Sequence, residues 1–212
     1  MSEHVILLHG LARTARSMRG LARSLSLAGY VVHNCDYHST QLSIEEAAMS
    51  TLPKAIEMTA SGDRVHIVTH SLGGLLVRYY LRHHSVPNLG RVVMLSPPNQ
   101  GSEIADWLQP IPPFHRIFGP VLAQLGTGDE QLPAHLGPAN FELGIIAGTR
   151  ALNFLFYALL AKPNDGTVSV ERTKLSGMCD HLCLPATHPL IMKNKQTIAQ
   201  VLHFLRHGRF SH

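Results

Sequence analysis

The sequence predicts an α/β fold of three layers, in which a mostly parallel β-sheet is flanked by helices on both faces. In the first half of the chain, short and continuously apolar runs such as 5–8 alternate with amphipathic stretches. Continuous apolar strands separated by amphipathic helices are typical of a parallel sheet that is covered on both sides. The chain has 212 residues, 45% of them hydrophobic, so we expect one domain over residues 1–212 with a full core.

The expected elements of the first half follow from apolar periodicity and from helix start and stop signals. Ser43-Ile-Glu-Glu46 is a capping box that begins a helix, and Pro53 is expected to interrupt or kink that helix. Gly29 is a C-terminal stop for the helix before it. The expected strands are 5–8, 30–33, 64–69 and 91–95, and the expected helices are 17–28, 43–60 and 72–83.

The regular alternation breaks between Ser102 and Asn140. Six of the 13 prolines lie there, among apolar residues that form no clear strand. A stretch of this length without regular structure is uncommon in a compact domain and is usually functional. We therefore expect a lid-like insertion over about 103–140 that contains short helices. Beyond it, strands are expected at 141–147 and 180–184 and a terminal helix from about residue 190.

One serine, Ser71, stands between a β-branched run and an amphipathic run, in His-Ile-Val-Thr-His-Ser-Leu-Gly-Gly at 66–74. A serine in a sharp turn between strand and helix takes a strained backbone conformation, so its Oγ projects from the C-terminal edge of the sheet. Gly73 and Gly74 allow close packing around such a turn. The pattern G-x-S-x-G is matched except at its first position, where Thr69 crowds the turn. Ser71 could instead be a helix N-cap, but capping explains neither the buried strand nor the two glycines.

A serine hydroxyl becomes a nucleophile when a base takes its proton, and the base needs a carboxylate that holds its tautomer. Asp165, in the turn-forming segment 163–168, lies beyond the strand expected at 141–147. His188, in the loop 184–189, directly precedes the last helix. These two residues are the candidate acid and base.

Other acidic residues and histidines compete for these roles. Asp165 could be only a turn residue in Asn-Asp-Gly, and Asp180 is its main rival. Asp36 and Asp63 are poorer candidates because they precede the serine. The chain contains 15 histidines, and His188 is favoured among those after Asp165 because the others lie in the expected last helix, in a strand or at the terminus. These others are His181, His203, His207 and His212.

Two backbone N–H groups are needed to stabilise the negative charge that develops on a carbonyl oxygen. Leu72 N–H directly follows the serine, and Leu11 N–H in the loop after the first strand is the expected second donor. Gly10 lets that loop turn sharply beneath the substrate. His9 and His70 flank the site, where packing or loop orientation is a more ordinary role for them than chemistry.

Five segments outside residues 103–140 together resemble one enzyme superfamily. They are Val5-Ile-Leu-Leu-His-Gly-Leu11, Val68-Thr-His-Ser-Leu-Gly-Gly74, Leu95-Ser-Pro-Pro-Asn-Gln-Gly-Ser102, Asn164-Asp-Gly-Thr-Val-Ser169 and the loop Leu184–Pro189. With them the chain resembles the α/β-hydrolase superfamily. The resemblance is to its small bacterial serine esterases and lipases, related to minimal triacylglycerol lipases and GPI inositol-deacylase-like hydrolases.

The resemblance implies the α/β-hydrolase fold and hydrolysis of carboxylic esters through an acyl-enzyme intermediate, without a cofactor. It also implies a triad of Ser71, Asp165 and His188, which follow one another in the order serine, acid, histidine. Two alternatives stay open at this point. One is acyl transfer to an alcohol or amine through the same intermediate, and the other is an inactive protein of this fold that only binds a ligand.

The apolar residues of the insertion are either core residues or contacts for an acyl chain. Each CH₂ group that a substrate buries contributes about 0.8 kcal/mol, so an apolar cap favours small-molecule or lipid esters over charged substrates. We expect Trp107 and Phe114, together with Gly10 and His70, to contact the substrate.

The basic residues bear on which partners the chain could bind. The formal charge is +4 and the pI about 9.2, but the basic residues are scattered and not interleaved with aromatic residues. This argues against nucleic-acid binding. Four arginines recur at near-helical spacing, which predicts a solvated helix face. Alternatively, Arg13, close to the Leu11 loop, contacts an anionic part of the substrate. The four are Arg13, Arg16, Arg19 and Arg23.

Cysteine usage and the absence of targeting signals predict a cytoplasmic protein. Three cysteines are an odd number, which fits a reducing compartment. No apolar run approaches the roughly 20 residues of a membrane span, and no signal peptide is recognisable at the N-terminus. Cys179-Asp-His-Leu-Cys183 lacks a second ligand pair, so no metal site is expected. Nothing in the sequence indicates the oligomeric state.

Overall fold

Six parallel strands form one sheet in the computed structural model, which describes residues 2–59, 62–152 and 154–212. In space the strands follow the order β2-β1-β3-β4-β5-β6, and every neighbouring pair is parallel. The strands are β1 (Glu3–Leu8), β2 (Val31–Cys35), β3 (Arg64–His70), β4 (Leu89–Leu95), β5 (Leu143–Gly148) and β6 (Asp180–Leu184). The predicted parallel sheet is confirmed, and each expected strand is present within a few residues of its predicted bounds.

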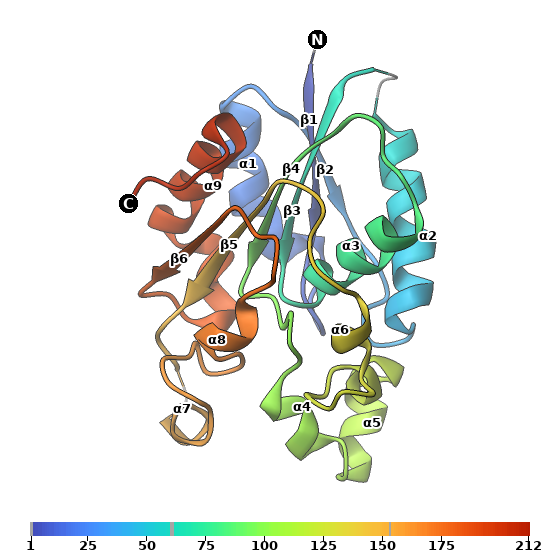
Figure 1. Cartoon of the computed structure of the whole chain (residues 1–212), viewed down its shortest axis with the longest axis vertical. Coiled ribbons are helices and arrows are strands. Elements are labelled where there is room, and N and C mark those ends of the chain that lie inside the picture. Colours follow the sequence, from blue (N-terminus) through green and yellow to red (C-terminus); the bar gives the residue numbers. More distant parts are fainter. Residues whose placement is uncertain (1, 60–61, 153) are drawn as a thin grey trace.

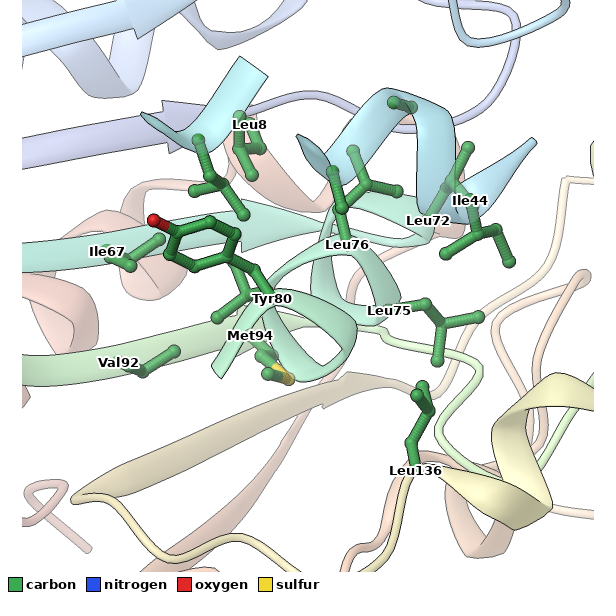
Figure 2. Packing of buried hydrophobic residues seen from close by; sticks show 14 of the residues in the cluster. Leu8, Ile44, Ile67, Leu72, Leu75, Leu76, Tyr80, Val92, Met94 and Leu136 are labelled. Atoms are coloured by element: carbon green, nitrogen blue, oxygen red, sulfur yellow. The ribbon is translucent and has the colours of Figure 1, made fainter. Parts of the chain in front are cut away.

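Side chains alternate between two hydrophobic cores because successive strand residues point to opposite faces of the sheet. Ile6 and Leu8 of β1 belong to the core beneath α2 (Ile44–Glu57) and α3 (Leu72–His83). Val5 and Leu7 belong to the core beneath α1 (Arg19–Leu27) and α9 (Lys195–His207). Figure 1 shows these helix pairs on opposite faces of the sheet, and Figure 2 shows the packing of Leu72, Leu75 and Leu76 on the first core. The three predicted layers are thus present.

The strand order places a crevice at one end of the sheet. From β1 the chain moves to β2 on one side, and then it returns to β3 and continues outward on the other side. In sheets of this kind, ligands bind at the carboxyl ends of the strands where the order reverses. The loops that leave β1 and β3 therefore border the expected binding crevice.

The capping box of α2 is present as predicted. Ser43 Oγ accepts a hydrogen bond from Glu46 N at 3.2 Å, and Glu46 Oε2 accepts one from Ser43 N at 2.8 Å. Of the two predicted effects of Pro53, the interruption is wrong, because α2 continues through this residue, and the kink stays a prediction. Burial of one face of α2 against α3 offsets the main-chain hydrogen bond that proline cannot donate. The helix ends at Glu57, and the predicted end at residue 60 lies outside the described residues.

Some helices differ from the expected ones. The terminal helix is divided at Asn194, whose side chain caps α9 by accepting from Gln196 N and Thr197 N. Before it lies the 3-10 helix η3 (His188–Lys193). Three short helices were not predicted as separate elements, namely η1 (Ala15–Met18), α7 (Phe154–Leu159) and α8 (Val170–Thr173).

The insertion contains short helices, as expected, and they lie beyond the carboxyl ends of the strands (Figure 1). A buried arginine of α3 ties this segment to the sheet, because Arg78 Nη1 donates to Asn99 O at 2.7 Å and Nη2 donates to Gly137 O at 3.0 Å. Burial lowers the pKa of Arg78 to about 10. The helices of the segment are α4 (Glu103–Leu108), α5 (Pro112–Phe118), η2 (Pro120–Gln124) and α6 (Leu132–His135).

Several histidines on the strands, or directly after them, are buried and poorly hydrated. His66 of β3 is completely buried, and its Nδ1 accepts a hydrogen bond from Arg91 N at 2.8 Å. The pKa of His66 is lowered, mainly by its burial. Burial likewise lowers the pKa values of His9, His33, His70 and His181.

No helix within the described ranges combines the length and the apolar character that crossing a membrane would require.

We predict that Ser43→Ala lowers the free energy of unfolding by about 1 kcal/mol, because it removes the acceptor for Glu46 N at the start of α2. Urea denaturation measures the change. Ser50→Ala is the matched control, since it makes the same substitution inside the same helix, where alanine is the better helix former. An equal loss in both variants would contradict the capping role of Ser43.

We also predict that the protein loses stability in mild acid. The folded-state pKa of the buried histidines lies below the unfolded value of about 6.5. The unfolded state therefore binds more protons as the pH falls through that value, and the free energy of unfolding decreases until the folded-state pKa values are passed. Above about pH 7 these histidines are neutral in both the folded and the unfolded state, so they no longer lower the free energy of unfolding.

Urea titrations at about pH 7.5, 6 and 5 test this dependence. His66→Gln keeps an acceptor for Arg91 N but removes one titrating group, so its stability should fall less steeply with acid. His207→Gln, at an exposed position, is the control. A His66→Gln slope equal to that of the wild type would contradict the prediction.

Candidate active site

Ser71 lies at the sharp turn between β3 and α3, beside the crevice defined by the strand order. Its backbone has φ 52° and ψ −119°, a region that non-glycine residues rarely adopt. Ser71 N donates to Leu95 O at 2.9 Å, which ties the turn to the end of β4. Ser71 occupies the N-cap position of α3, yet its side chain caps no amide. The alternative of a plain helix cap is therefore wrong, and Ser71 Oγ is available for other partners.

Small residues let the chain pass close to this turn. A Cβ atom on Gly73 would lie 3.0 Å from His9 O, which is tighter than an ordinary contact, so the glycine allows α3 to pack this near to the loop after β1. The threonine that departs from the G-x-S-x-G pattern is fully buried. Its Oγ1 lies 3.5 Å from the point where a Cβ on Gly74 would stand. This is an ordinary van der Waals distance, so Thr69 fits at the turn without depending on Gly74.

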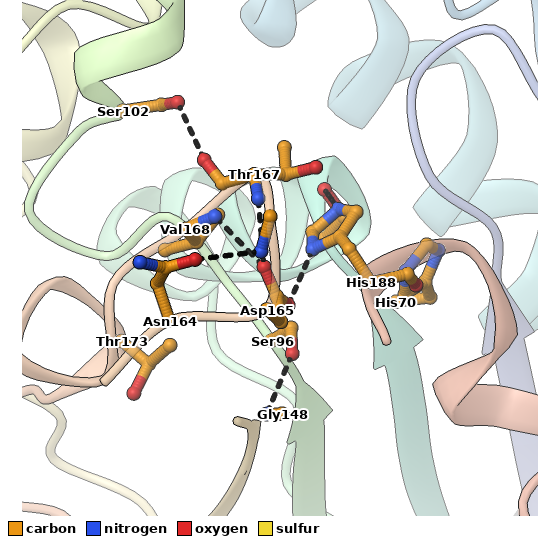
Figure 3. A network of polar contacts seen from close by, with 12 residues as sticks. His70, Ser96, Ser102, Gly148, Asn164, Asp165, Thr167, Val168, Thr173 and His188 are labelled. Carbon is orange, nitrogen blue, oxygen red and sulfur yellow. Dashed lines mark hydrogen bonds and ion pairs between the residues drawn. The ribbon is translucent and has the colours of Figure 1, made fainter. Parts of the chain in front are cut away.

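The structure brings Ser71, His188 and Asp165 together in one chain of contacts. His188 Nε2 lies 3.0 Å from Ser71 Oγ, and His188 Nδ1 lies 2.7 Å from Asp165 Oδ2 (Figure 3). Because the carboxylate can only accept, Nδ1 donates to it and Nε2 is left with a lone pair. In this tautomer His188 can accept the hydroxyl proton of Ser71.

The Asp165 carboxylate is held by more than His188. Its other oxygen, Oδ1, accepts from Thr167 N at 3.0 Å and from Val168 N at 2.8 Å. The side chain is almost fully buried, and these amides replace the water that burial removes. His188 N also donates to Asp165 O at 3.1 Å, so the main chains of the two loops are joined. The relative position of the acid and the base is thus determined from several sides.

The rival residues lie elsewhere. Asp180 stands at the amino end of the edge strand β6, whereas Ser71 follows the carboxyl end of the central strand β3. Asp180 there accepts from Phe210 N at 2.8 Å. His181 Nε2 contacts Thr173 Oγ1 at 2.9 Å. His203 and His207 lie in α9 as expected. In the part of the chain that the structure describes, no three His, Cys, Asp or Glu side chains are grouped so as to hold a metal ion.

The two predicted amide donors both border the cavity at Ser71. As the first residue of α3, Leu72 has an N–H without a partner in the helix. In the loop after β1, Ala12 N donates to Ser39 Oγ at 3.1 Å and Arg13 N to Gly10 O at 3.3 Å. Leu11 N meets no acceptor among the described residues, so this amide is free to bind a ligand.

Buried rings support the loop after β1. Tyr37 OH donates to His9 O at 2.6 Å, and the two rings are stacked with centroids 4.1 Å apart. On the other side, a Cβ on Gly10 would lie 2.7 Å from His70 Nδ1, so Gly10 rests directly on this ring. No sequence signal indicated Tyr37 or Ser39 as supports, since both contact the loop only through tertiary structure.

His70 also holds the loop of His188. Its Nε2–H donates to His188 O at 3.0 Å, and the two rings are 4.9 Å apart. Burial, followed by the neighbouring His188, lowers the pKa of His70 well below its usual value. His70 is therefore neutral, which keeps a second positive charge away from His188.

A cavity of about 390 Å³ opens at Ser71, and we call it the serine cavity. Its wall is mainly apolar and includes residues of the insertion, among them Ile104, Leu108, Phe118, Leu122 and Leu125. Of the four residues expected to contact the substrate, His70 lines this cavity, whereas Gly10, Trp107 and Phe114 do not. In α4, the residues at 104, 105 and 108 form one face that turns to the cavity, which directs Trp107 elsewhere. Phe114 instead packs on the core and stacks with Phe118.

Among known proteins, a family model described as the alpha/beta hydrolase fold matches residues 3–118. No curated protein matches the chain. The matched range covers more than half of the chain and extends from β1 to the end of α5, so it includes Ser71. Asp165 and His188 lie beyond it.

Solved structures extend the likeness over the whole chain. Lipase BlEst2 of Bacillus licheniformis, in its mature form, has a TM-score of 0.74 and 20% identity, over 95% of this chain and 91% of that one. A metagenomic carboxyl esterase has a TM-score of 0.68 and 18% identity, and the match covers 90% of this chain and 65% of the esterase. A gene product of Listeria innocua has a TM-score of 0.67 and 17% identity, and the match covers 98% of this chain and 95% of the Listeria protein. Identities this low show a common fold, and together with the family match they establish that the chain belongs to the α/β-hydrolase fold family.

Proposed function

We propose that this protein is a serine hydrolase that cleaves carboxylic esters through an acyl-enzyme intermediate. The observation that carries the proposal is the continuous contact from Ser71 Oγ to His188 Nε2 at 3.0 Å and from His188 Nδ1 to Asp165 Oδ2 at 2.7 Å. A hydroxyl, an imidazole and a carboxylate in this order are what nucleophilic attack on an acyl carbon requires. The lipase and carboxyl esterase names among the structures of similar fold support the same chemistry.

In the first half of the reaction, Ser71 Oγ attacks the ester carbonyl carbon while His188 Nε2 takes the hydroxyl proton. The carbonyl oxygen becomes an oxyanion that accepts from the N–H groups of Leu11 and Leu72. Asp165 holds His188 in the required tautomer and stabilises the imidazolium that forms. When the carbon–oxygen bond to the alcohol breaks, His188 gives its proton to the leaving oxygen, and the acyl group stays on Ser71.

In the second half, water takes the place of the alcohol. His188 Nε2 removes a proton from the water as its oxygen attacks the acyl carbon, and the same two amides bind the oxyanion again. The bond to Ser71 Oγ then breaks, and His188 returns the proton to that oxygen. The carboxylic acid leaves and the starting state is restored.

The serine cavity is the proposed site of the acyl group. Its apolar wall suits a hydrocarbon chain, because each buried CH₂ contributes about 0.8 kcal/mol. Part of that wall comes from the insertion, through Ile104, Leu108 and Phe118. We therefore propose that residues 103–140 act as a cap on the site within a single domain.

Ser71→Ala should abolish turnover of p-nitrophenyl acyl esters, with a loss of at least about a thousandfold in kcat, while the far-UV circular dichroism spectrum is unchanged. The reason is the loss of the nucleophile. A fluorophosphonate probe should label the wild type on the peptide that contains Ser71 and should not label the variant. Ser26→Ala, at an exposed position of α1, is the control. Retained activity or labelling in Ser71→Ala would refute the proposal.

Asp165→Asn should lower kcat by about ten-thousandfold, because an amide no longer holds His188 with Nε2 free to accept a proton. The matched control is Asp180→Asn, the same change at the rival acid at the amino end of β6. It should keep its activity per folded molecule. If the losses were equal, or larger at residue 180, the assignment of Asp165 would be wrong.

A further inference from the structure

A second and larger cavity adjoins the serine cavity. It has a volume of about 950 Å³ and is lined by residues 12–14, by residues 35–42 and by one face of α2. Ala12 and Arg13 line both cavities, so these two residues form the boundary between them. A molecule bound at Ser71 that extends past Ala12 therefore enters the second cavity.

The two cavities differ in chemistry. Apart from Ser71, His70 and His188, the wall of the serine cavity is nearly all apolar. Among the described residues that line it, Arg13 carries the one permanent charge. The second cavity has a mixed wall with Arg13, Asp36 and Lys54. An anionic group would be costly to bury in an apolar wall without a partner, so of the two cavities the second suits it.

The charged groups of the second cavity leave an excess of positive charge. Within the described ranges, no carboxylate lies within 4.0 Å of the Arg13 or Lys54 cations. Asp36, the acid of this wall, already accepts from Ala15 N at 3.2 Å and lies 2.9 Å from His9 Nε2. Two cations with one engaged carboxylate would attract an anion, and a guanidinium can bind phosphate or carboxylate through two parallel hydrogen bonds.

We propose that the second cavity is the alcohol-side subsite, that it takes esters whose alcohol part carries an anionic group, and that Arg13 selects them. The inference rests on the proposed function, because it requires the ester carbonyl to lie at Ser71. With the carbonyl oxygen on the Leu11 and Leu72 amides and the acyl chain in the serine cavity, the alcohol part crosses the boundary at Ala12. It then reaches Arg13, which is exposed there.

The electrostatics at His70 agree with this placement. Burial is the main cause of the lowered pKa of His70, and the positive charge of Arg13 contributes to it. Arg13 is thus within electrostatic reach of the residue next to Ser71. An anionic leaving group bound by Arg13 would be close enough to feel the same charge during the reaction.

Two matched chromogenic esters test the proposal. Both are hexanoyl esters of a nitrophenol, and the ring carries a carboxylate in one and a carboxamide in the other. Arg13→Ala should lower the ratio of kcat/KM for the anionic over the neutral ester by about fivefold, as expected for a solvent-exposed charge pair. Arg13→Glu should lower it further, and added salt should reduce the preference of the wild type.

Arg19→Ala is the matched control, because Arg19 is exposed on the next helix and lines neither cavity. Its ratio should equal that of the wild type. An unchanged ratio in both Arg13 variants, while the neutral ester is still cleaved, would overturn the proposal and leave the proposed function intact. Failure of the wild type to cleave either ester would instead overturn the proposed function.

Vesicles then distinguish the two sources of such an anion. Faster fatty-acid release from phosphatidylglycerol than from phosphatidylcholine vesicles, lost in Arg13→Glu, would identify a lipid headgroup. Cleavage of the dissolved anionic ester without that lipid preference would identify a water-soluble ester. Equal dependence on Arg13 for neutral and anionic substrates in both assays would contradict the selection of an anion.

Discussion

The backbone at Ser71 has a φ of 52°. The arrangement of the site depends on keeping the backbone in this conformation. A conformation of this kind costs on the order of 1–3 kcal/mol and persists only when its surroundings determine it. Here the surroundings are the hydrogen bond from Ser71 N to Leu95 O and the close approach of Gly73 to His9 O. Both constraints come from the parallel sheet, because they join the ends of β1, β3 and β4. The packing of the sheet thus holds the turn in place, with Ser71 lining the serine cavity.

The buried hydrogen bonds among Asp165, His188 and His70 also depend on the turn at Ser71. The Asp165 carboxylate is stabilised by two amides of its own turn and by His188. His188 is positioned from the other side by His70, the residue that precedes Ser71. Since each partner is held by groups outside the three residues themselves, the contacts are set before a ligand binds. Such preorganised polar groups in a water-poor site are a principal source of rate enhancement in enzymes.

Much of the architecture could be read from local patterns. The continuous apolar strands and amphipathic helices predicted the parallel sheet because strands buried on both faces are mostly apolar along their whole length. The capping box at Ser43 predicted the start of α2 because its two hydrogen bonds involve residues only three apart. The helix is not interrupted at Pro53 as predicted, since the local cost of a proline is outweighed by burial against α3, which no local pattern reveals. The helices of residues 154–173 escaped prediction for a related reason, being too short for a periodic signal.

The sequence by itself determined which residues were candidates for the site, because the elbow at Ser71 and the order of Ser71, Asp165 and His188 are properties of the chain. Tertiary structure alone decided between Asp165 and Asp180, since the register of β6 on β5 puts Asp180 at the amino end of the sheet, away from Ser71. It also decided that Ile104 and Leu108, and not Trp107, line the serine cavity, because one helix face is selected when α4 packs. Tertiary structure also decided that Tyr37 and Ser39 support the loop after β1 and that Arg13 lies at the boundary of the two cavities. Their contacts join segments distant in sequence, and distance in sequence carries no information about contact until the chain has folded.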